Sequence, residues 1–185
     1  MSHFTVIYDA CVLYPAPLRD FLLRLALRDL FRARWTEQIL DEMQRAILNT
    51  RDDIPEERLQ RMRGLMNEHV RDAVITGYQP LVNGIDLPDP DDRHVLAAAI
   101  RGGAQIILKD LPKSELATFG IESQHPDDFL EHLFDLHPSI LLDVAKEWRT
   151  SLRNPPQSPD DIISALERQS LPKFANLLRD YVSLI

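Results

Sequence analysis

The feature of the sequence that most constrains the fold is a pair of short apolar runs, FTVIY at residues 4–8 and AQIIL at residues 104–108. Both runs are rich in apolar, β-branched or aromatic residues, which is typical of strands buried inside a sheet. An amphipathic run over residues 18–31 follows the first strand, and an apolar helical run over residues 92–101 precedes the second. Buried strands that alternate with helices predict an α/β fold, in which helices cover both faces of a central parallel sheet.

Shorter patterns predict the remaining elements of this α/β domain. We expect helices over residues 37–48, 55–70 and 126–136, short strands over residues 32–35 and 73–77, and a loop over residues 79–92. Thr36 is the expected N-cap of the helix that follows it, because its hydroxyl can accept a hydrogen bond from an unpaired backbone N–H. In open parallel sheets ligands bind at the carboxyl ends of the strands, so we expect the functional site at that edge.

The chain changes character after residue 136, where helical patterns continue without strands between them. Helices are expected over residues 139–152, 160–171 and 172–184, and Ser158 is placed to start the second of them. We therefore divide the chain into an α/β domain over residues 1–136 and a small helical C-terminal subdomain over residues 137–185.

The composition favours a soluble cytoplasmic protein without a membrane partner. No apolar run approaches the roughly 20 residues needed to span a bilayer, and the N-terminal MSHFTVIYDA lacks the features of a signal peptide. The single cysteine, Cys11, excludes an internal disulfide and suits a reducing compartment. The net charge of −8 argues against a surface that binds nucleic acid at every point.

Acidic residues gather where strands of the predicted sheet end. Asp9 directly follows the first strand, Asp110 lies just past the last, and Asp89, Asp91 and Asp92 precede the helix that leads into it. One carboxylate would suffice to cap that helix, and further ones repel each other unless a cation binds them. Hard cations such as Mg²⁺ or Mn²⁺ prefer carboxylate oxygens. We therefore predict metal ligation by Asp9, Asp89, Asp92 and Asp110; Asp92 is also the expected helix cap, and Asp91 is expected to face solvent.

The helix over residues 37–48 is expected to supply a further acid. Glu42 lies beside the apolar stripe of this helix and near its start, so its side chain can reach the strand ends. In a metal-dependent nuclease these acids hold the ion that activates a water and stabilises the charge on the phosphate. The candidate catalytic residues are Asp9, Glu42 and Asp92. By contrast, we expect His94 to be a surface or packing histidine and Cys11 to be a buried, unreactive thiol.

Three arginines are candidates for contacts with nucleic acid. Arg24, Arg28 and Arg32 are spaced four residues apart, which would place them along one face of a single helix. Arginine favours bidentate contacts with phosphate, so this face could hold an RNA backbone. A solvated face whose arginines pair with nearby acids accounts for the same spacing equally well.

Four segments of the chain resemble the successive motifs of PIN-domain ribonucleases: VIYDACVL, WTEQILDEMQRAI, LPDPDDRHVLAAAI and IILKDL. More narrowly, they resemble the VapC-type toxins of bacterial toxin–antitoxin pairs, and the helical tail resembles an extension found in one subgroup of these toxins. The resemblance implies a PIN-like three-layer α/β/α fold and an endoribonuclease that depends on Mg²⁺, or on Mn²⁺ in its place. It also implies a structured RNA substrate, often tRNA, a cognate antitoxin that blocks the site, and a homodimer.

The resemblance assigns roles residue by residue. Asp9 matches the first acid of the family, Glu42 the second and Asp92 the third, while Asp89 matches an additional acid of the subgroup. The family pattern departs from this chain after Leu108. Such toxins have Thr or Ser and then Asn or Asp before a Leu-Lys-Asp segment, whereas here the segment is shorter by about three residues. If the short segment is native, one side of the metal site is weakened, and so is the case for Asp110 as a ligand.

Two other classes of protein also place acids at strand ends, and each needs an Asp at a position where this chain has another residue. A phospho-accepting receiver domain would need an Asp at the end of the third strand, and the run over residues 73–77 ends without one. A haloacid-type phosphatase would need a second Asp two positions after Asp9, where Cys11 stands. The alternative that stays open is a degenerate PIN domain that binds RNA or a protein without cleaving.

Overall fold

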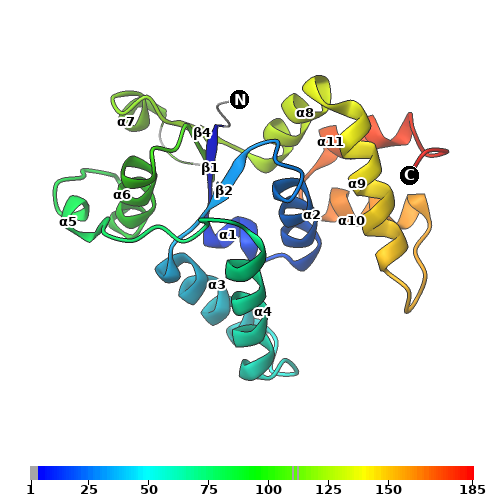
Figure 1. Ribbon diagram of the computed structural model, residues 1–185, viewed down its shortest axis with the longest axis horizontal. Helices are drawn as coiled ribbons and strands as arrows, with labels where there is room; N and C mark the ends of the chain where they lie inside the picture. Colours follow the sequence, from blue (N-terminus) through cyan, green and yellow to red (C-terminus); the bar gives the residue numbers. More distant parts are fainter. Residues whose placement is uncertain (1–3, 110, 112) are drawn as a thin grey trace.

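In the computed structural model, which describes residues 4–109, 111 and 113–185, the strands form a four-stranded parallel sheet in the order β2-β1-β3-β4 (Figure 1). The strands are β1 (Thr5–Tyr8), β2 (Arg32–Arg34), β3 (Ile106–Leu108) and β4 (Glu122–Gln124). In the register of the sheet, Val6 of β1 lies opposite Ala33 on one side and Ile106 on the other. All four residues of β1 are buried, as expected for a central strand with both faces covered.

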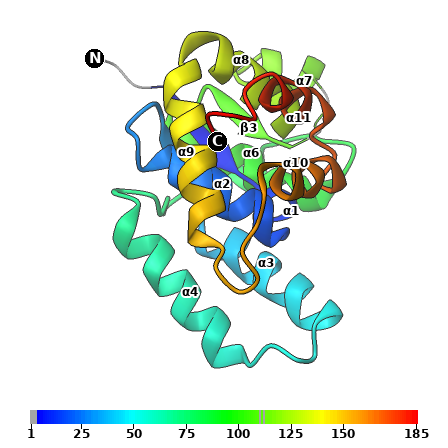
Figure 2. The ribbon, with the colours of Figure 1, turned by 90° about the vertical axis from the view of Figure 1, so that its right-hand side faces the viewer.

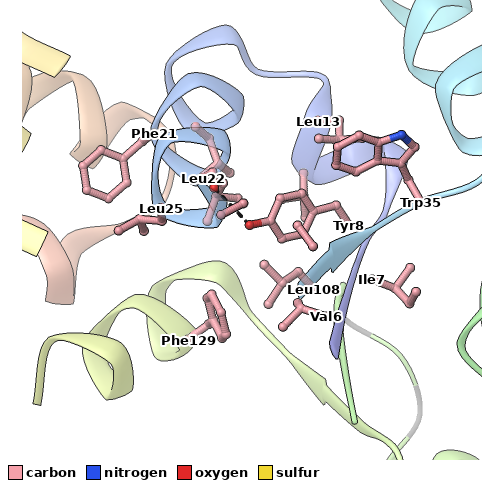
Figure 3. Close-up of a cluster of buried hydrophobic side chains, with 14 of the residues drawn as sticks. Val6, Ile7, Tyr8, Leu13, Phe21, Leu22, Leu25, Trp35, Leu108 and Phe129 are labelled. Carbon is pink, nitrogen blue, oxygen red and sulfur yellow. Dashed lines mark hydrogen bonds between the residues drawn. The ribbon is translucent and has the colours of Figure 1, made fainter. Parts of the chain in front are cut away.

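Helices cover both faces of the sheet, so the predicted three-layer α/β/α arrangement is confirmed (Figure 1). α6 (Arg93–Gly102) lies on one face, and α2 (Ala16–Ala26) and α8 (Pro126–Leu136) lie on the other. Tyr8 points from β1 toward α2, where its hydroxyl donates a hydrogen bond to the carbonyl oxygen of Leu22 at 3.1 Å (Figure 3). Buried hydrophobic side chains surround this hydrogen bond and fill the layer between β1 and α2.

The α/β part contains further helices outside these layers. They are α1 (Ala10–Leu13), α3 (Glu37–Thr50), α4 (Glu56–His69), α5 (Gln79–Val82), the 3₁₀ helix η1 (Pro90–Asp92) and α7 (Lys113–Ala117). Thr36 caps α3 as predicted, because its hydroxyl oxygen accepts a hydrogen bond from the backbone N–H of Ile39 at 3.1 Å. α3 and α4 lie below the sheet in Figure 1, on the side where β1 ends.

The predicted helical C-terminal region is also confirmed. It consists of α9 (Pro138–Ser151), α10 (Pro159–Arg168) and α11 (Pro172–Arg179). Figure 2 shows α9 running across α2, with α10 and α11 beside it. Phe21 of α2 contacts Trp148 of α9 and Phe174 of α11, with ring centroids 5.7 and 5.3 Å apart. Within the described residues, no helix is both long enough and apolar enough to cross a membrane.

Two predicted elements differ in the structure. The helix expected over residues 18–31 ends at Ala26, because the chain turns through Asp29, which has a positive φ of 54°. The strand expected over residues 73–77 is reduced to one parallel bridge between Val74 and Trp35. Asp72 and Gly77, with φ values of 53° and 72°, turn the chain away from an extended path at either end of that segment.

Other differences concern short or polar segments. The expected loop over residues 79–92 contains α5 and η1. The last two helices end at Arg168 and Arg179, short of the predicted limits at 171 and 184. β4 was not predicted, because Glu122 and Gln124 are polar residues on an edge strand.

Candidate active site

The register of the sheet brings Asp9 and Lys109 together at its carboxyl edge. Tyr8 lies opposite Leu108 in the parallel pair of β1 and β3, so the residues that follow them emerge side by side. Asp9 is the N-cap of α1, and its Oδ2 accepts a hydrogen bond from the backbone N–H of Cys11 at 3.4 Å. Asp92 reaches the same point from the start of α6.

The Lys109 ammonium lies between these two carboxylates. Its Nζ is 3.1 Å from Asp9 Oδ2 and 2.5 Å from Asp92 Oδ1. Partial burial opposes the charge on Lys109, but the contacts with Asp92 and Asp9 outweigh it and raise the pKa of the ammonium well above its usual value. Asp9 itself is only 2% exposed, and its second oxygen, Oδ1, has no hydrogen-bond partner among the described residues.

Asp92 occupies the N-cap position of α6 as predicted, but its side chain forms no capping hydrogen bond. Its backbone is helical, and its carboxylate contacts Lys109 instead. Asp89 acts as the local cap, with Oδ1 accepting a hydrogen bond from the N–H of Asp91 at 2.9 Å at the start of η1. Asp89 and Asp91 are both exposed, as expected for Asp91.

Glu42 is held by a buried histidine. Its Oε1 lies 3.0 Å from Nε2 of His94 and accepts a hydrogen bond from the Gln38 side chain at 3.3 Å. His94 is 6% exposed, and its Nδ1 is buried without a partner in the described part of the chain. The sequence pattern alone predicted only a surface or packing role for this residue. The signal that could have found it was its position two residues after Asp92, in the first turn of the same helix.

Most of the side chains described above line one pocket of about 660 Å³, beside which Asp9 lies buried. Its lining includes Glu42, Asp89, Asp92, His94 and Lys109. Arg45, one turn after Glu42 on α3, is exposed and also lines the pocket. Acids, a histidine and two cationic side chains therefore face one solvent-filled space at the predicted edge of the sheet.

The donor set fits a hard divalent cation when it is judged by its chemistry. Mg²⁺ in proteins is commonly held by one or two carboxylates with water completing its shell. Asp9 and Asp92 supply two carboxylates that already converge on a cation, the ammonium of Lys109, and Asp9 Oδ1 is an oxygen without a partner among the described residues. These two residues would hold the metal.

Asp89, another predicted ligand, does not join Asp9 and Asp92 at the ammonium of Lys109. The Asp89 carboxylate is turned toward its own backbone, and Asp110 lies outside the described residues. No group of three or more His, Cys, Asp or Glu side chains is arranged to hold a metal ion in the part of the chain that the structure describes. Among the described residues, the site therefore consists of two carboxylates with the ammonium of Lys109 between them.

The arginines predicted to contact RNA are distributed differently from the helical face that the sequence suggested. α2 ends before Arg28 and Arg32, so the three do not share a helix. Arg24 hydrogen-bonds to Asp20 and to Ser151 of α9, both at 3.0 Å, and Arg28 forms an ion pair with Glu147 of α9.

Arg32 begins β2 and pairs with Thr5 at the amino-terminal edge of the sheet, opposite the acids. It lines a larger pocket of about 750 Å³ at that edge. That pocket is larger than the acidic one, but Glu42, Asp92 and Lys109 line only the acidic pocket, so the larger pocket is not the candidate active site.

Cys11 is exposed, which corrects the expectation that it is buried. The protein atoms around the thiol, and then the neighbouring Asp9 carboxylate, raise the pKa of Cys11 to about 12. A thiol with so high a pKa is protonated near neutral pH and is a poor nucleophile. The expectation that Cys11 is unreactive therefore agrees with its surroundings.

The parallel three-layer fold and the acids that converge beyond its strand ends are features of nuclease-like α/β domains. This is the class of domain that the sequence motifs predicted. Residues 5–109 match the family described as PIN domain, and residues 126–180 match the family described as VapC50 C-terminal domain. The chain belongs to the PIN-domain family, and its helical tail is similar to the VapC50 C-terminal domain, so the predicted resemblance is confirmed.

One curated relative is similar to a large part of the chain. "Putative ribonuclease VapC50" of Mycobacterium tuberculosis (strain ATCC 25618 / H37Rv) is 39% identical over 107 residues. The match covers 56% of this chain and 62% of that relative, so it spans less than two thirds of the relative's length. No solved structure matches the chain significantly.

Proposed function

We propose that this chain is a toxin ribonuclease that cleaves RNA phosphodiester bonds with the help of Mg²⁺, or of Mn²⁺ in its place. One observation carries the proposal. Asp9 from the end of β1 and Asp92 from the start of α6 converge on one cationic group, beside a pocket that Glu42 also lines. This is the arrangement expected of carboxylates that hold a divalent ion at the carboxyl edge of a parallel sheet.

Each side chain at the site has its own role in the proposed cleavage. Asp9 and Asp92 would hold the ion, which when bound supplies an activated water and neutralises charge on the phosphate. Glu42, oriented by His94 and Gln38, faces the pocket as the carboxylate that accepts a proton there. Arg45 on the rim of the pocket is placed to contact a phosphate that flanks the cleaved bond.

The proposal includes a structured RNA, with tRNA as the substrate, a cognate antitoxin of a type II toxin–antitoxin pair, and a homodimer. The RNA substrate and the antitoxin are supported by the family match and by the VapC50 relative, whereas tRNA and the homodimer are supported by the resemblance of the sequence motifs alone. A cytoplasmic location is supported by the single cysteine, which suits a reducing compartment.

The first test is cleavage of total tRNA by the purified protein with Mg²⁺, with excess EDTA, and with Asp9→Asn. We expect discrete fragments with Mg²⁺ that disappear in the other two reactions. Asp135→Asn is the matched control, because Asp135 is an exposed residue of α8 outside the pocket, and it should cleave like the unchanged protein. Fragments that persist in EDTA would contradict metal dependence, and fragments that persist with Asp9→Asn would contradict the assigned site.

A second function is favoured by one feature of the site. Lys109 stands where the metal would bind, and the segment after Leu108 is short, as in a degenerate PIN domain that binds RNA or a protein without cleaving. The distinguishing result is retention of RNA on a filter with no fragments at any Mg²⁺ or Mn²⁺ concentration. Fragments in the tRNA assay that depend on Mg²⁺ would exclude this alternative.

A further inference from the structure

Lys109 occupies the space between Asp9 and Asp92 that a divalent ion would need. We propose that the Lys109 ammonium is a built-in competitor of the metal, so that a divalent ion binds only after this side chain has moved out from between the two carboxylates. The inference deepens the proposed function, because it rests on Asp9 and Asp92 being the metal-binding carboxylates, and it adds a control on when the site is loaded.

The backbone of Lys109 is fixed in this position by β-sheet contacts. Its N–H donates hydrogen bonds to the carbonyl oxygens of Ile107 and Gln124, at 3.1 and 3.2 Å. The buried Ser123 hydroxyl donates to the Lys109 carbonyl oxygen and accepts from the N–H of Leu111, at 2.8 Å for the latter. Strand register and a buried hydroxyl both hold the backbone of this residue. Its side chain therefore begins beside Asp9 whether or not the ammonium contacts the carboxylates.

Electrostatics explains why the ammonium stays there in the absence of a metal. Two carboxylates that face each other across a few ångströms repel, and the repulsion is stronger where water is excluded. Asp9 is nearly fully buried, and the Asp92 side chain is 16% exposed. The ammonium offsets this repulsion by forming an ion pair with each carboxylate. The same arrangement makes Lys109 and a divalent ion alternatives, because both need the space between the same two carboxylates.

The lysine side chain has a route out of the site. It is 22% exposed and it lines the pocket, so its four-carbon chain can carry the ammonium into solvent without movement of the backbone. When only a fraction of the molecules is competent to bind a ligand, the apparent affinity is reduced by that fraction. Metal affinity is therefore weakened in proportion to how rarely Lys109 leaves the carboxylates.

The direct test is Mn²⁺ binding, measured from the electron paramagnetic resonance signal of free Mn²⁺ during a titration. Lys109→Met removes the charge and keeps a side chain of similar length. We expect it to bind Mn²⁺ about tenfold more tightly than the unchanged protein, because no competitor remains. Lys146→Met is the matched control, since Lys146 is exposed on α9, and it should leave Mn²⁺ affinity unchanged.

The gain must also depend on the carboxylates. Adding Asp9→Asn to Lys109→Met should abolish the increase in affinity. Equal or weaker Mn²⁺ binding by Lys109→Met would overturn the proposal, and so would a gain that survives Asp9→Asn. Circular dichroism of each variant, with and without Mn²⁺, shows whether it is folded during the titration.

A second measurement needs no variant, so it holds even if Lys109→Met fails to fold. Lysines of the unchanged protein are acylated with a water-soluble reagent, and the rate at each lysine is read by peptide mass spectrometry. Mg²⁺ should raise the rate at Lys109 several-fold and leave the rate at Lys146 unchanged. A rate at Lys109 that saturating Mg²⁺ does not raise would overturn the proposal.

These readouts separate the competition at Lys109 from the proposed ribonuclease activity. A protein whose Lys109 variant gains Mn²⁺ affinity but which cleaves no RNA would contradict the ribonuclease proposal and uphold the competition. A protein that cleaves RNA with Mg²⁺, but whose Mn²⁺ affinity is indifferent to Lys109, would uphold the ribonuclease proposal and overturn the competition.

Discussion

Two side chains that are not acids, Lys109 and His94, set the geometry of the acids at the carboxyl edge of the sheet. Lys109 draws Asp9 and Asp92 toward one point, and His94 holds Glu42 at 3.0 Å. His94 is buried with its other ring nitrogen unpartnered among the described residues, so its polar contact in that part of the chain is the one with Glu42. In the proposed reaction, the role of this histidine is to orient the Glu42 carboxylate.

His94→Gln should therefore lower RNA cleavage by roughly tenfold or more, the usual effect of removing a residue that orients a group in a metal site. The check is the rate of tRNA cleavage by His94→Gln, by Glu42→Gln and by the double variant. Because His94 works through Glu42, the double variant should cleave no more slowly than Glu42→Gln alone. His132→Gln, at an exposed position on α8, is the control. Additive losses would show that His94 has a separate role.

The acids were predictable at the residue scale, whereas their partners were not. Asp9 follows a strand and Asp92 precedes a helix, and both positions are marked by the local pattern alone. The contact of Lys109 with both depends on the register that places Leu108 beside Tyr8, which no local pattern encodes. The contact between His94 and Glu42 likewise depends on how α6 and α3 meet.

At the scale of single elements, the start of α3 matters most to the site because this helix carries Glu42. Thr36 is fully buried at that start and accepts the hydrogen bond of the Ile39 N–H. Thr36→Ala leaves that donor unpaired, so the free energy of unfolding should fall by about 1–2 kcal/mol. Urea denaturation measures the change.

The control for this cap is Thr150→Ala. The Thr150 hydroxyl is exposed and donates to the carbonyl of Lys146 within α9, a contact that adds little to helix stability. Its free energy of unfolding should stay within about 0.5 kcal/mol of the unchanged protein. If the two variants lost equal stability, the cap would not be what holds the start of α3.

The strands were predictable only where burial left a clear pattern. β1 and β3 carry apolar residues because helices cover both of their faces. β4 is an edge strand in which Ser123 alone is buried, so the apolar pattern that identifies a strand is missing. In the run over residues 73–77, by contrast, the apolar pattern of a strand is present but a regular strand does not form. Ala73 and Ile75 are buried and look like a strand, but positive φ angles on either side prevent the extended pairing.

At the scale of the whole molecule, the helical tail and the α/β part share one hydrophobic core. Phe21 of α2 contacts aromatic rings of α9 and α11, and the backbone N–H groups of Lys173 and Phe174 donate to the buried Asp127 of α8, both at 3.0 Å. The arginines first considered for RNA binding, Arg24 and Arg28, also bond to α9. The division at residue 136, predicted from the sequence, therefore cuts through continuous packing.

A chain that ends at residue 136 is expected to be much less stable than the full chain. This truncation exposes Phe21 and the buried face of α8, and it removes the backbone N–H groups that donate to Asp127. Removing the contacts of even one large buried aromatic residue costs about 3–5 kcal/mol, a large share of the stability of an ordinary domain. Thermal unfolding followed by circular dichroism, with gel filtration to detect association through the exposed face, measures the effect. A monomeric 1–136 chain that unfolds cooperatively at the temperature of the full protein would show that the α/β part is an independent domain after all.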